Sequence, residues 1–283
     1  MNNVTDLERA TPDCVIAMFT AYFDDSGTDG NSDIAIAACY VSTKRGWDDF
    51  VSAWDDARWE EGFEAFHMVD FVAPPQYGHK PFCDWDNAKK SHVYARLANI
   101  INQNKRIGIA AAVPKQVWDS TPEFIRGFYG REHYTFAVRQ CLLRIAEWKK
   151  RSLISFPIRY VFDWEMRHES KRIEIEKLLD FISEHQDVAK LYGLEPAGYG
   201  FEHKEEFKPL QAADVLAWQM RSHMRKIWPA GQDVEELCHP GFRTLREDQE
   251  MDLGFFTEAQ IDDFVAKAGA IIKESGFSAV LYP

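Results

Sequence analysis

The sequence predicts a mixed α/β domain in which helices flank a single sheet. Short apolar runs typical of buried strands lie at 14–21, 34–41, 106–113 and 158–163. Longer segments with apolar residues at helical spacing separate most of these runs. The first two runs are joined by a short polar turn, which predicts an antiparallel hairpin. This interleaving of strands and helices favours a layered α/β architecture that opens with a hairpin.

Each helix is predicted from apolar residues that recur three or four positions apart. Between 47 and 59 these residues are Trp47, Phe50, Val51 and Trp54. A short strand is expected at 197–201. The segment 62–85 is expected to form a short helix that enters a long loop. A second loop, rich in Thr, Pro and Gly, is expected between the third strand and Tyr129. By the same spacing, helices are predicted at 47–59, 87–102, 132–150, 170–185, 209–227 and 257–274.

The chain of 283 residues fits one large domain with insertions. We expect residues 14–228 to form one domain around a mixed sheet. Residues 229–283 are expected to pack on that domain as a helical C-terminal extension. No internal repeat or low-complexity tract interrupts this organisation.

Composition excludes several classes of protein. Hydrophobic residues make up 46% of the chain, which is inconsistent with disorder. No segment approaches the roughly 20 apolar residues of a membrane span, and the N-terminus lacks signal-peptide features, so we expect a cytoplasmic protein that does not bind membranes. The five cysteines are scattered, which favours reduced thiols. The net charge of −12 argues against broad adhesion to nucleic acid but permits a local basic groove.

Two adjacent carboxylates, Asp24 and Asp25, follow the first strand at the turn Ser26-Gly27. Neighbouring side chains of a strand point to opposite faces, so we expect one carboxylate to face a site and the other to face solvent. Taken alone, this stretch is also explained by ordinary turn chemistry, because Asp, Ser and Gly favour turns. The positions of other carboxylates in the chain are needed to choose between these two interpretations.

Two further carboxylates have suitable positions. Asp163 ends the fourth predicted strand, and Asp214 lies on the helix predicted at 209–227. If the first and fourth strands are neighbours and that helix packs across them, Asp24, Asp163 and Asp214 converge. Clusters of carboxylate oxygens suit Mg²⁺ or Mn²⁺. Two such ions about 3.5–4 Å apart can activate a water and stabilise the leaving oxygen in phosphodiester cleavage.

A helical projection at about 100° per residue places Asp214 at the rim of the buried stripe. It shares that face with Gln211, Arg221 and Arg225. These three residues are therefore candidates for binding a substrate that carries phosphate. The alternative is that Asp214 belongs to an ion network with the two arginines on the helix surface.

Four segments together resemble a known family: Tyr22 to Gly27, Phe66 to Phe71, Tyr160 to Asp163, and Pro209 to Trp218. The family is the uncharacterised bacterial and phage group called domain of unknown function 3800, which has a ribonuclease H-like fold. The resemblance spans roughly 16–225, and its first and last motifs are the specific ones.

The resemblance implies a metal-dependent, nuclease-like site. Asp24, Asp163 and Asp214 would form its acidic core, with Glu64 or His67 as a fourth member. A single histidine beside a phenylalanine is equally explained as a packed, hydrogen-bonded residue. The chain departs from the family pattern at Asp25, where the family usually has glutamate, and this shorter side chain reaches less far. Glu165 is a spare carboxylate two residues beyond Asp163.

These features lead to a functional expectation. The sequence contains no P-loop, no dinucleotide-binding glycine motif and no serine nucleophile elbow. We expect a hydrolase that depends on Mg²⁺ or Mn²⁺ and cleaves a nucleic acid, with DNA and RNA both left open. The alternative is a non-catalytic binding or accessory protein of phage or mobile-element biology that retains the fold. The acidic balance and Asp25 motivate this alternative.

Overall fold

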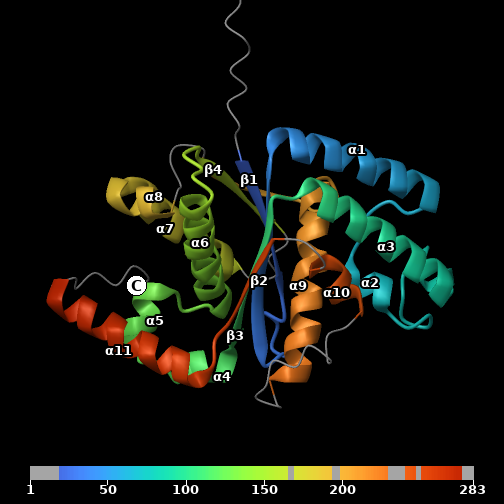
Figure 1. Cartoon of the computed structure of the whole chain (residues 1–283). Helices are drawn as coiled ribbons and strands as arrows, with labels where there is room; N and C mark the ends of the chain where they lie inside the picture. Colours follow the sequence, from blue (N-terminus) through green and yellow to red (C-terminus); the bar gives the residue numbers. More distant parts are fainter. Residues whose placement is uncertain (1–18, 165–168, 193–197, 229–239, 247–249, 276–283) are drawn as a thin grey trace, which may run out of the picture.

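The computed structural model describes residues 19–164, 169–192, 198–228, 240–246 and 250–275. They form a mixed α/β fold around a six-stranded sheet in the order β5-β4-β1-β2-β3-β6, with helices on both faces (Figure 1). The predicted α/β class is confirmed. The strands are β1 (Phe19–Ser26), β2 (Ile34–Thr43), β3 (Ile107–Pro114), β4 (Ile158–Asp163), β5 (Tyr199–Glu202) and β6 (Met251–Phe255).

The sheet combines antiparallel and parallel pairs. β2 pairs antiparallel with both β1 and β3, which confirms the predicted hairpin. β4 lies parallel to β1 on its other side, β5 is parallel to β4, and β6 is parallel to β3. Phe23 of β1 is in register with Phe162 of β4. The next residues, Asp24 and Asp163, are therefore neighbours at the same edge of the sheet.

Different sets of helices cover the two faces of the sheet (Figure 1). One face carries α1, α3, α9 and α10, and α9 packs directly on β1 and β2. The other face carries α6, α7 and α8, together with α11 beside α4 and α5. The helices are α1 (Lys44–Glu61), α2 (Met68–Val72), a 3₁₀ turn (Phe82–Asp84), α3 (Asn87–Asn104), α4 (Lys115–Asp119), α5 (Glu123–Tyr129), α6 (His133–Arg151), α7 (Glu169–Glu184), α8 (Gln186–Tyr192), α9 (Lys208–Ile227), α10 (Pro240–Arg246) and α11 (Glu258–Ser275).

Alternation along the strands divides the apolar side chains between two cores. In β1, Ala21 and Phe23 pack toward α6, whereas Tyr22 packs toward α1 and α9. In β2, Cys39 belongs to the core on the α6 side, and Tyr40 belongs to the core on the α9 side. Because the central strands are buried on both faces, their sequences read as continuous apolar runs rather than as alternating patterns.

Local sequence signals set the ends of two long helices. The Thr43 side chain accepts a hydrogen bond from the Gly46 backbone at 3.1 Å and caps the start of α1. Gly62, at φ 80°, ends the same helix in the left-handed conformation that glycine adopts without strain. Asp86 caps α3 by accepting from the Lys89 backbone at 2.7 Å.

Three parts of the chain differ from the prediction. β1 continues through Ser26, because its pairing with β2 extends that far, and residues 14–18 lie outside the described residues. The segment predicted as a loop before residue 130 contains α4 and α5. The C-terminal region contributes β6 to the sheet as well as helices, whereas only helix was expected there.

Lys105 fastens the C-terminal region to the rest of the fold. The residue is buried at the end of α3, and its ammonium donates to the Leu245 carbonyl of α10 at 3.0 Å. The ammonium also donates to Asn102 at 2.6 Å and lies 5.1 Å from the ring centre of Tyr40. Burial lowers the pKa of Lys105 to about 7.

This burial predicts a pH-dependent stability. The ordinary lysine value is 10.5, so between pH 7 and that value the unfolded chain binds more protons than the folded one. Stability should therefore rise with pH across this window. Relative to Lys105→Met, the wild type should gain roughly 2–3 kcal/mol of unfolding free energy between about pH 7 and 9.5. Urea unfolding of both proteins measures the difference, and a difference that stays constant with pH would contradict the prediction.

Candidate functional site

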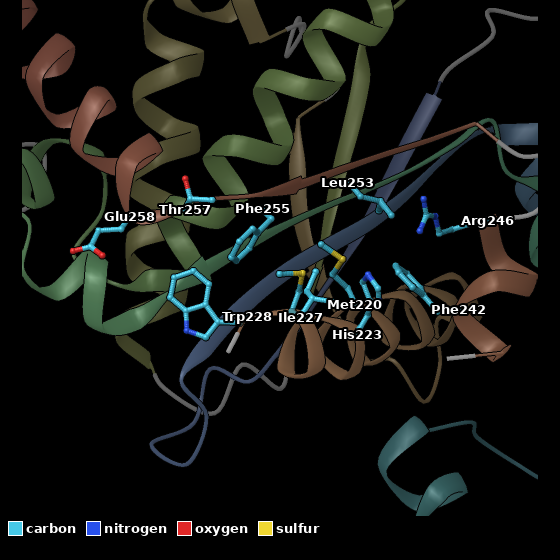
Figure 2. A pocket seen from close by; sticks show the side chains of 11 residues that line it. Met220, His223, Ile227, Trp228, Phe242, Arg246, Leu253, Phe255, Thr257 and Glu258 are labelled. Atoms are coloured by element: carbon cyan, nitrogen blue, oxygen red, sulfur yellow. The ribbon is translucent and has the colours of Figure 1, made fainter. Parts of the chain in front are cut away.

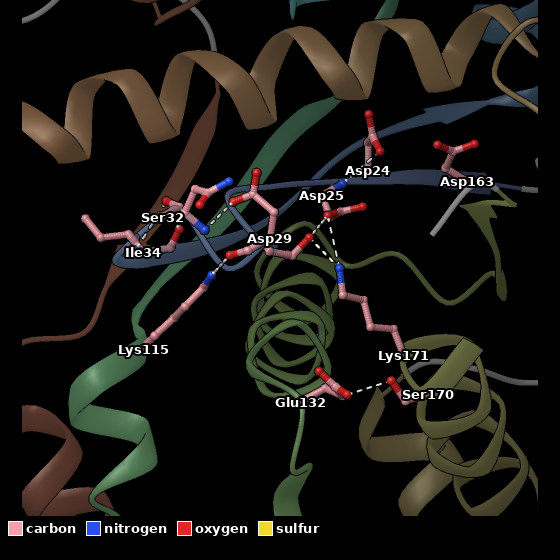
Figure 3. Close-up of polar contacts among 12 residues, drawn as sticks. Asp24, Asp25, Asp29, Ser32, Ile34, Lys115, Glu132, Asp163, Ser170 and Lys171 are labelled. Atoms are coloured by element: carbon pink, nitrogen blue, oxygen red, sulfur yellow. Dashed lines mark hydrogen bonds and ion pairs between the residues drawn. The ribbon is translucent and has the colours of Figure 1, made fainter. Parts of the chain in front are cut away.

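Asp24 and Asp163 form the centre of the candidate site. Both side chains are almost completely buried, at 1% and 3% exposure, on the face of the sheet that carries α9, and they lie side by side in Figure 3. An Oδ2 atom of each contacts the ammonium of Lys204, at 3.0 Å for Asp24 and 2.9 Å for Asp163. Because both carboxylate oxygens contact the same nitrogen, the separation between them cannot exceed the sum of these two distances. The expected convergence of these two carboxylates is therefore present.

Asp214 reaches the same site from α9. It lines a pocket together with Asp24 and Asp163, and one of its oxygens accepts a hydrogen bond from the Met68 backbone at 2.7 Å. This bond fixes the start of α2 against α9. Within the described residues, no ion pair joins Asp214 to Arg221 or Arg225, so the alternative of a surface ion network on α9 receives no support.

The pocket carries more negative than positive charge. Burial, followed by the nearby carboxylates of Asp214 and Asp163, raises the pKa of Asp24 well above its ordinary value, although the Lys204 ammonium opposes this shift. Burial alone would lower the pKa of Lys204. The carboxylates of Asp24, Asp214 and Asp163 have the larger effect, so this pKa lies well above its ordinary value. Three carboxylates around one ammonium leave an excess of negative charge. The pocket therefore favours additional positive charge.

Lys204 decides how a metal ion could fit. Among the described residues, no three His, Cys, Asp or Glu side chains are arranged as a metal-binding group. At this site the Lys204 ammonium contacts both Asp24 and Asp163. The donor set consists of carboxylate oxygens, which suits Mg²⁺ or Mn²⁺. An ion at this position would require the lysine side chain to move aside.

Asp25 has a different role from Asp24. It points toward α7, and its Oδ2 accepts a hydrogen bond from the hydroxyl of Thr28 (Figure 3). The buried ammonium of Lys171 donates to the same hydroxyl at 2.5 Å and lies 3.7 Å from the Asp25 carboxylate. The expectation that the second carboxylate faces solvent is therefore wrong. Asp25 is only 19% exposed and connects the turn after β1 to α7.

Gly27 allows Arg221 to approach the turn after β1. Gly27 has φ 69°, and a Cβ at this position would collide with the Ile34 carbonyl and lie 2.9 Å from Cδ of Arg221. Arg221 lines the carboxylate pocket, and its buried Nε has no hydrogen-bond partner. Within the described residues it forms no ion pair. It is the predicted substrate-binding residue that the structure brings to the site.

The other predicted residues divide into two groups. His67 lines the pocket, and its Nε2 lies 3.4 Å from a Glu205 oxygen. Glu64 is exposed and does not line the pocket, because the neighbouring Phe63 and Phe66 are buried and turn the Glu64 side chain outward. Arg225, one turn beyond Arg221, is also exposed and outside the pocket. The structure therefore does not bring Glu64 and Arg225 to the pocket.

Gln211 is structural rather than substrate-binding. It is completely buried, and its carbonyl oxygen accepts from the Trp54 indole at 3.0 Å and from the Phe66 backbone at 3.1 Å. Its amide nitrogen donates to the Lys204 carbonyl at 2.8 Å. A group with these internal bonds has no face for substrate. Instead, it holds the backbone on both sides of the pocket, before His67 and at Lys204.

Sequence reasoning missed two lysines of the pocket, Lys204 and Lys171. Lys204 follows β5 in a run of charged residues that looks like an ordinary exposed loop. Its position becomes informative only when β5 is known to lie parallel to β4, because the carboxyl ends of parallel strands meet at one edge. Lys171 lies on α7 at helical spacing from Ile175, Leu178 and Ile182, so the pattern of this helix could have placed it on the buried face. Glu165, the spare carboxylate, lies outside the described residues.

The carboxylate pocket has a volume of about 390 Å³. A separate cavity of about 490 Å³ lies between α9, α10 and β6, where Figure 2 shows Met220, Ile227, Trp228 and Phe255 around it. Its lining is mostly apolar, with Arg246 and Glu258 on opposite sides in the view, and it contains none of the site carboxylates. The carboxylate pocket is lined by Asp24, Asp25, Ser26, Gly27, Thr28, Asp29, His67, Val69, Asp163, Lys171, Lys204, Asp214, Trp218 and Arg221.

Comparisons of the chain with protein-family models, with curated proteins and with solved structures find no match. The described helices include none with the length and apolar character needed to cross a bilayer.

Proposed function

We propose that this protein is a nuclease-like hydrolase that cleaves phosphodiester bonds of nucleic acid with Mg²⁺ or Mn²⁺, on a ribonuclease H-like fold. The observation that carries the proposal is the meeting of Asp24 and Asp163 on adjacent parallel strands, opposite Asp214 on α9. The antiparallel strands β1, β2 and β3, extended on the β1 side by parallel strands, support the fold assignment.

Each group in the pocket has a role in this proposal. Asp24, Asp163 and Asp214 would hold the metal ion, since their oxygens converge and their negative charge exceeds that of the one ammonium between them. When bound, Mg²⁺ or Mn²⁺ would activate a water and stabilise the leaving oxygen. Arg221 would bind a substrate phosphate, because its guanidinium lines the pocket and has no carboxylate partner among the described residues.

A specific observation favours a second candidate, a non-catalytic binding or accessory protein. Lys204 already bridges Asp24 and Asp163 with two short contacts in a buried environment. A permanent bridge would satisfy both carboxylates and leave them without a metal. The two candidates therefore differ in whether divalent cations displace Lys204.

The test combines binding with cleavage. Calorimetric titration of the protein with Mn²⁺ should give saturable binding that Asp163→Asn removes. Fluorescent single-stranded DNA, duplex DNA and RNA should be assayed with Mg²⁺ and Mn²⁺, with EDTA as the control. We expect cleavage of at least one of these substrates that depends on the metal. A lack of both saturable binding and cleavage would reject the hydrolase and favour the accessory protein.

A further inference from the structure

A second pocket, of about 560 Å³, lies beside the carboxylate pocket and is called here the α3 pocket. Trp218 of α9 lines both pockets. Along α2 and the residue before it, His67 and Val69 line the carboxylate pocket, whereas Met68, Phe71 and Val72 line the α3 pocket. The two pockets are therefore neighbours separated only by Trp218 and α2. The α3 pocket is lined by Met68, Phe71, Val72, Asn87, Lys90, Ser91, Tyr94, Ala95, Trp218, Gln219, Pro240, Gly241 and Thr244.

Aromatic side chains form much of the lining of the α3 pocket. Phe71, Tyr94 and Trp218 come from three different helices, α2, α3 and α9. The rings of Phe71 and Tyr94 are 6.3 Å apart at an angle of 31°, so neither ring covers the other face to face. Tyr94 and Trp218 remain partly exposed. Aromatic side chains that line a cavity suit a flat ligand, because planar groups stack on aromatic rings.

The charge of the α3 pocket contrasts with that of the whole chain. The protein has a net charge of −12, and the carboxylate pocket contains five aspartates. Among the described residues, the lining of the α3 pocket includes no Asp or Glu, and its one charged side chain is Lys90. The Lys90 ammonium lies 5.8 Å from the ring centre of Phe71. A ligand that is flat and carries a negative charge nearby matches this combination.

One polar atom of the α3 pocket residue Gln219, its side-chain carbonyl oxygen, lacks a hydrogen-bond partner. The side chain is 1% exposed and lines the pocket, and it forms a hydrogen bond with the Tyr94 hydroxyl, which itself donates to the Gly241 carbonyl at 2.9 Å. The Gln219 carbonyl oxygen is buried without a hydrogen-bond partner. Buried polar atoms in proteins nearly always have partners, so a ligand donor that reached this acceptor would satisfy it.

We propose that the α3 pocket binds one unpaired nucleobase of a nucleic acid whose backbone passes through the carboxylate pocket. The base would stack among Phe71, Tyr94 and Trp218, and its amino group would donate to Gln219. A base must leave its stack and its pair to enter such a pocket, so the favoured strand is single-stranded or locally opened. The choice of ligand rests on the proposed function, but binding requires no hydrolysis.

The test fills the pocket without removing any of its contacts. Ala95 is exposed on α3 and lines the pocket, so Ala95→Trp should block it. Ala88→Trp is the matched control, because Ala88 is exposed on the same helix and lies outside the pocket. The probe is a short fluorescein-labelled oligodeoxyadenylate, with binding measured by anisotropy in EDTA. Ala95→Trp should weaken binding by about 10-fold or more, and Ala88→Trp should bind like the wild type.

Three further measurements separate base binding from backbone binding. An abasic oligonucleotide should bind the wild type as weakly as the adenylate binds Ala95→Trp. Duplex DNA should bind both proteins equally. Lys90→Glu should also weaken binding of the adenylate, which guards against a misfolded Ala95→Trp. Equal affinity of the wild type and both pocket variants for the adenylate would overturn the proposal.

The outcomes also distinguish this proposal from the proposed hydrolase. If Ala95→Trp weakens adenylate binding but no metal supports cleavage, the base pocket stands and the hydrolase fails. If cleavage occurs but neither filling the pocket nor removing the bases changes affinity, the hydrolase stands and the base pocket fails.

Discussion

Replacement of Asp24 by asparagine is expected to lower metal-dependent cleavage by about 10²–10³-fold while leaving the protein folded. Asparagine keeps the size of the side chain but removes one of the charges that would hold the metal. Burial and the neighbouring carboxylates already raise the pKa of Asp24, so a neutral side chain is tolerated there. Lys204 keeps its contact with Asp163 in this variant. The melting temperature without divalent cations should therefore not fall.

Asp25→Asn is the matched control for Asp24→Asn. Both residues lie at the end of β1, but Asp25 contacts Thr28 and Lys171 on the other face of the sheet. Asp25→Asn should leave Mn²⁺ affinity within a few-fold of the wild type and lower the stability of the fold instead, by about 1–3 kcal/mol. Initial cleavage rates, Mn²⁺ titrations and thermal unfolding measure these effects. Equal rates for Asp24→Asn and the wild type would exclude Asp24 from the reaction.

Replacement of Lys204 by methionine is expected to destabilise the metal-free protein by about 3–5 kcal/mol, which is typical when one partner of a buried ion pair is removed. The variant leaves Asp24 and Asp163 facing each other without the ammonium that now separates them. Millimolar Mn²⁺ should restore most of the lost stability, because a bound cation would replace the missing charge. The same variant should bind Mn²⁺ more tightly than the wild type.

Lys208→Met provides the control for Lys204→Met. Lys208 lies at the start of α9, is partly exposed, and contacts Asp55 at a longer distance of 3.7 Å. Its removal should cost less than about 1 kcal/mol and should not respond to Mn²⁺. Urea unfolding with and without Mn²⁺ measures both variants. If Mn²⁺ failed to stabilise Lys204→Met, the carboxylates would not be a metal site, and the accessory-protein candidate would be favoured.

The elements that periodicity defines could be predicted from the sequence. The central strands and long helices lie within a few residues of their predicted positions, because burial on one or both faces imposes an apolar pattern. On α9, Ala213, Leu216 and Met220 are buried as the projection predicted. The meeting of Asp24 with Asp163 depended on an assumed strand order, which pattern alone does not fix.

The errors at the site have physical causes. A projection of α9 gives the direction of Gln211 and Arg225 but not what covers each turn of the helix. Gln211 lies under Trp54 and Phe66, whereas Arg225 lies beyond the packed region. Lys204 was missed because its environment is assembled from β1 and β4, which are distant in sequence. β6 was missed because a short, half-exposed edge strand has neither alternation nor a long apolar run.

The place of β6 has a consequence for the order in which the fold can be completed during synthesis. β3 is buried along its whole length, yet its partner β6 is made about 140 residues later. Until then the growing chain presents an apolar edge strand, Ile107–Pro114, with unpaired backbone groups on one side. A chain that ended after α9 would leave that edge open to pairing with another copy. β6 thus covers an edge of β3 that is synthesised much earlier, and Lys105 contacts both α10 and the first residue of β6.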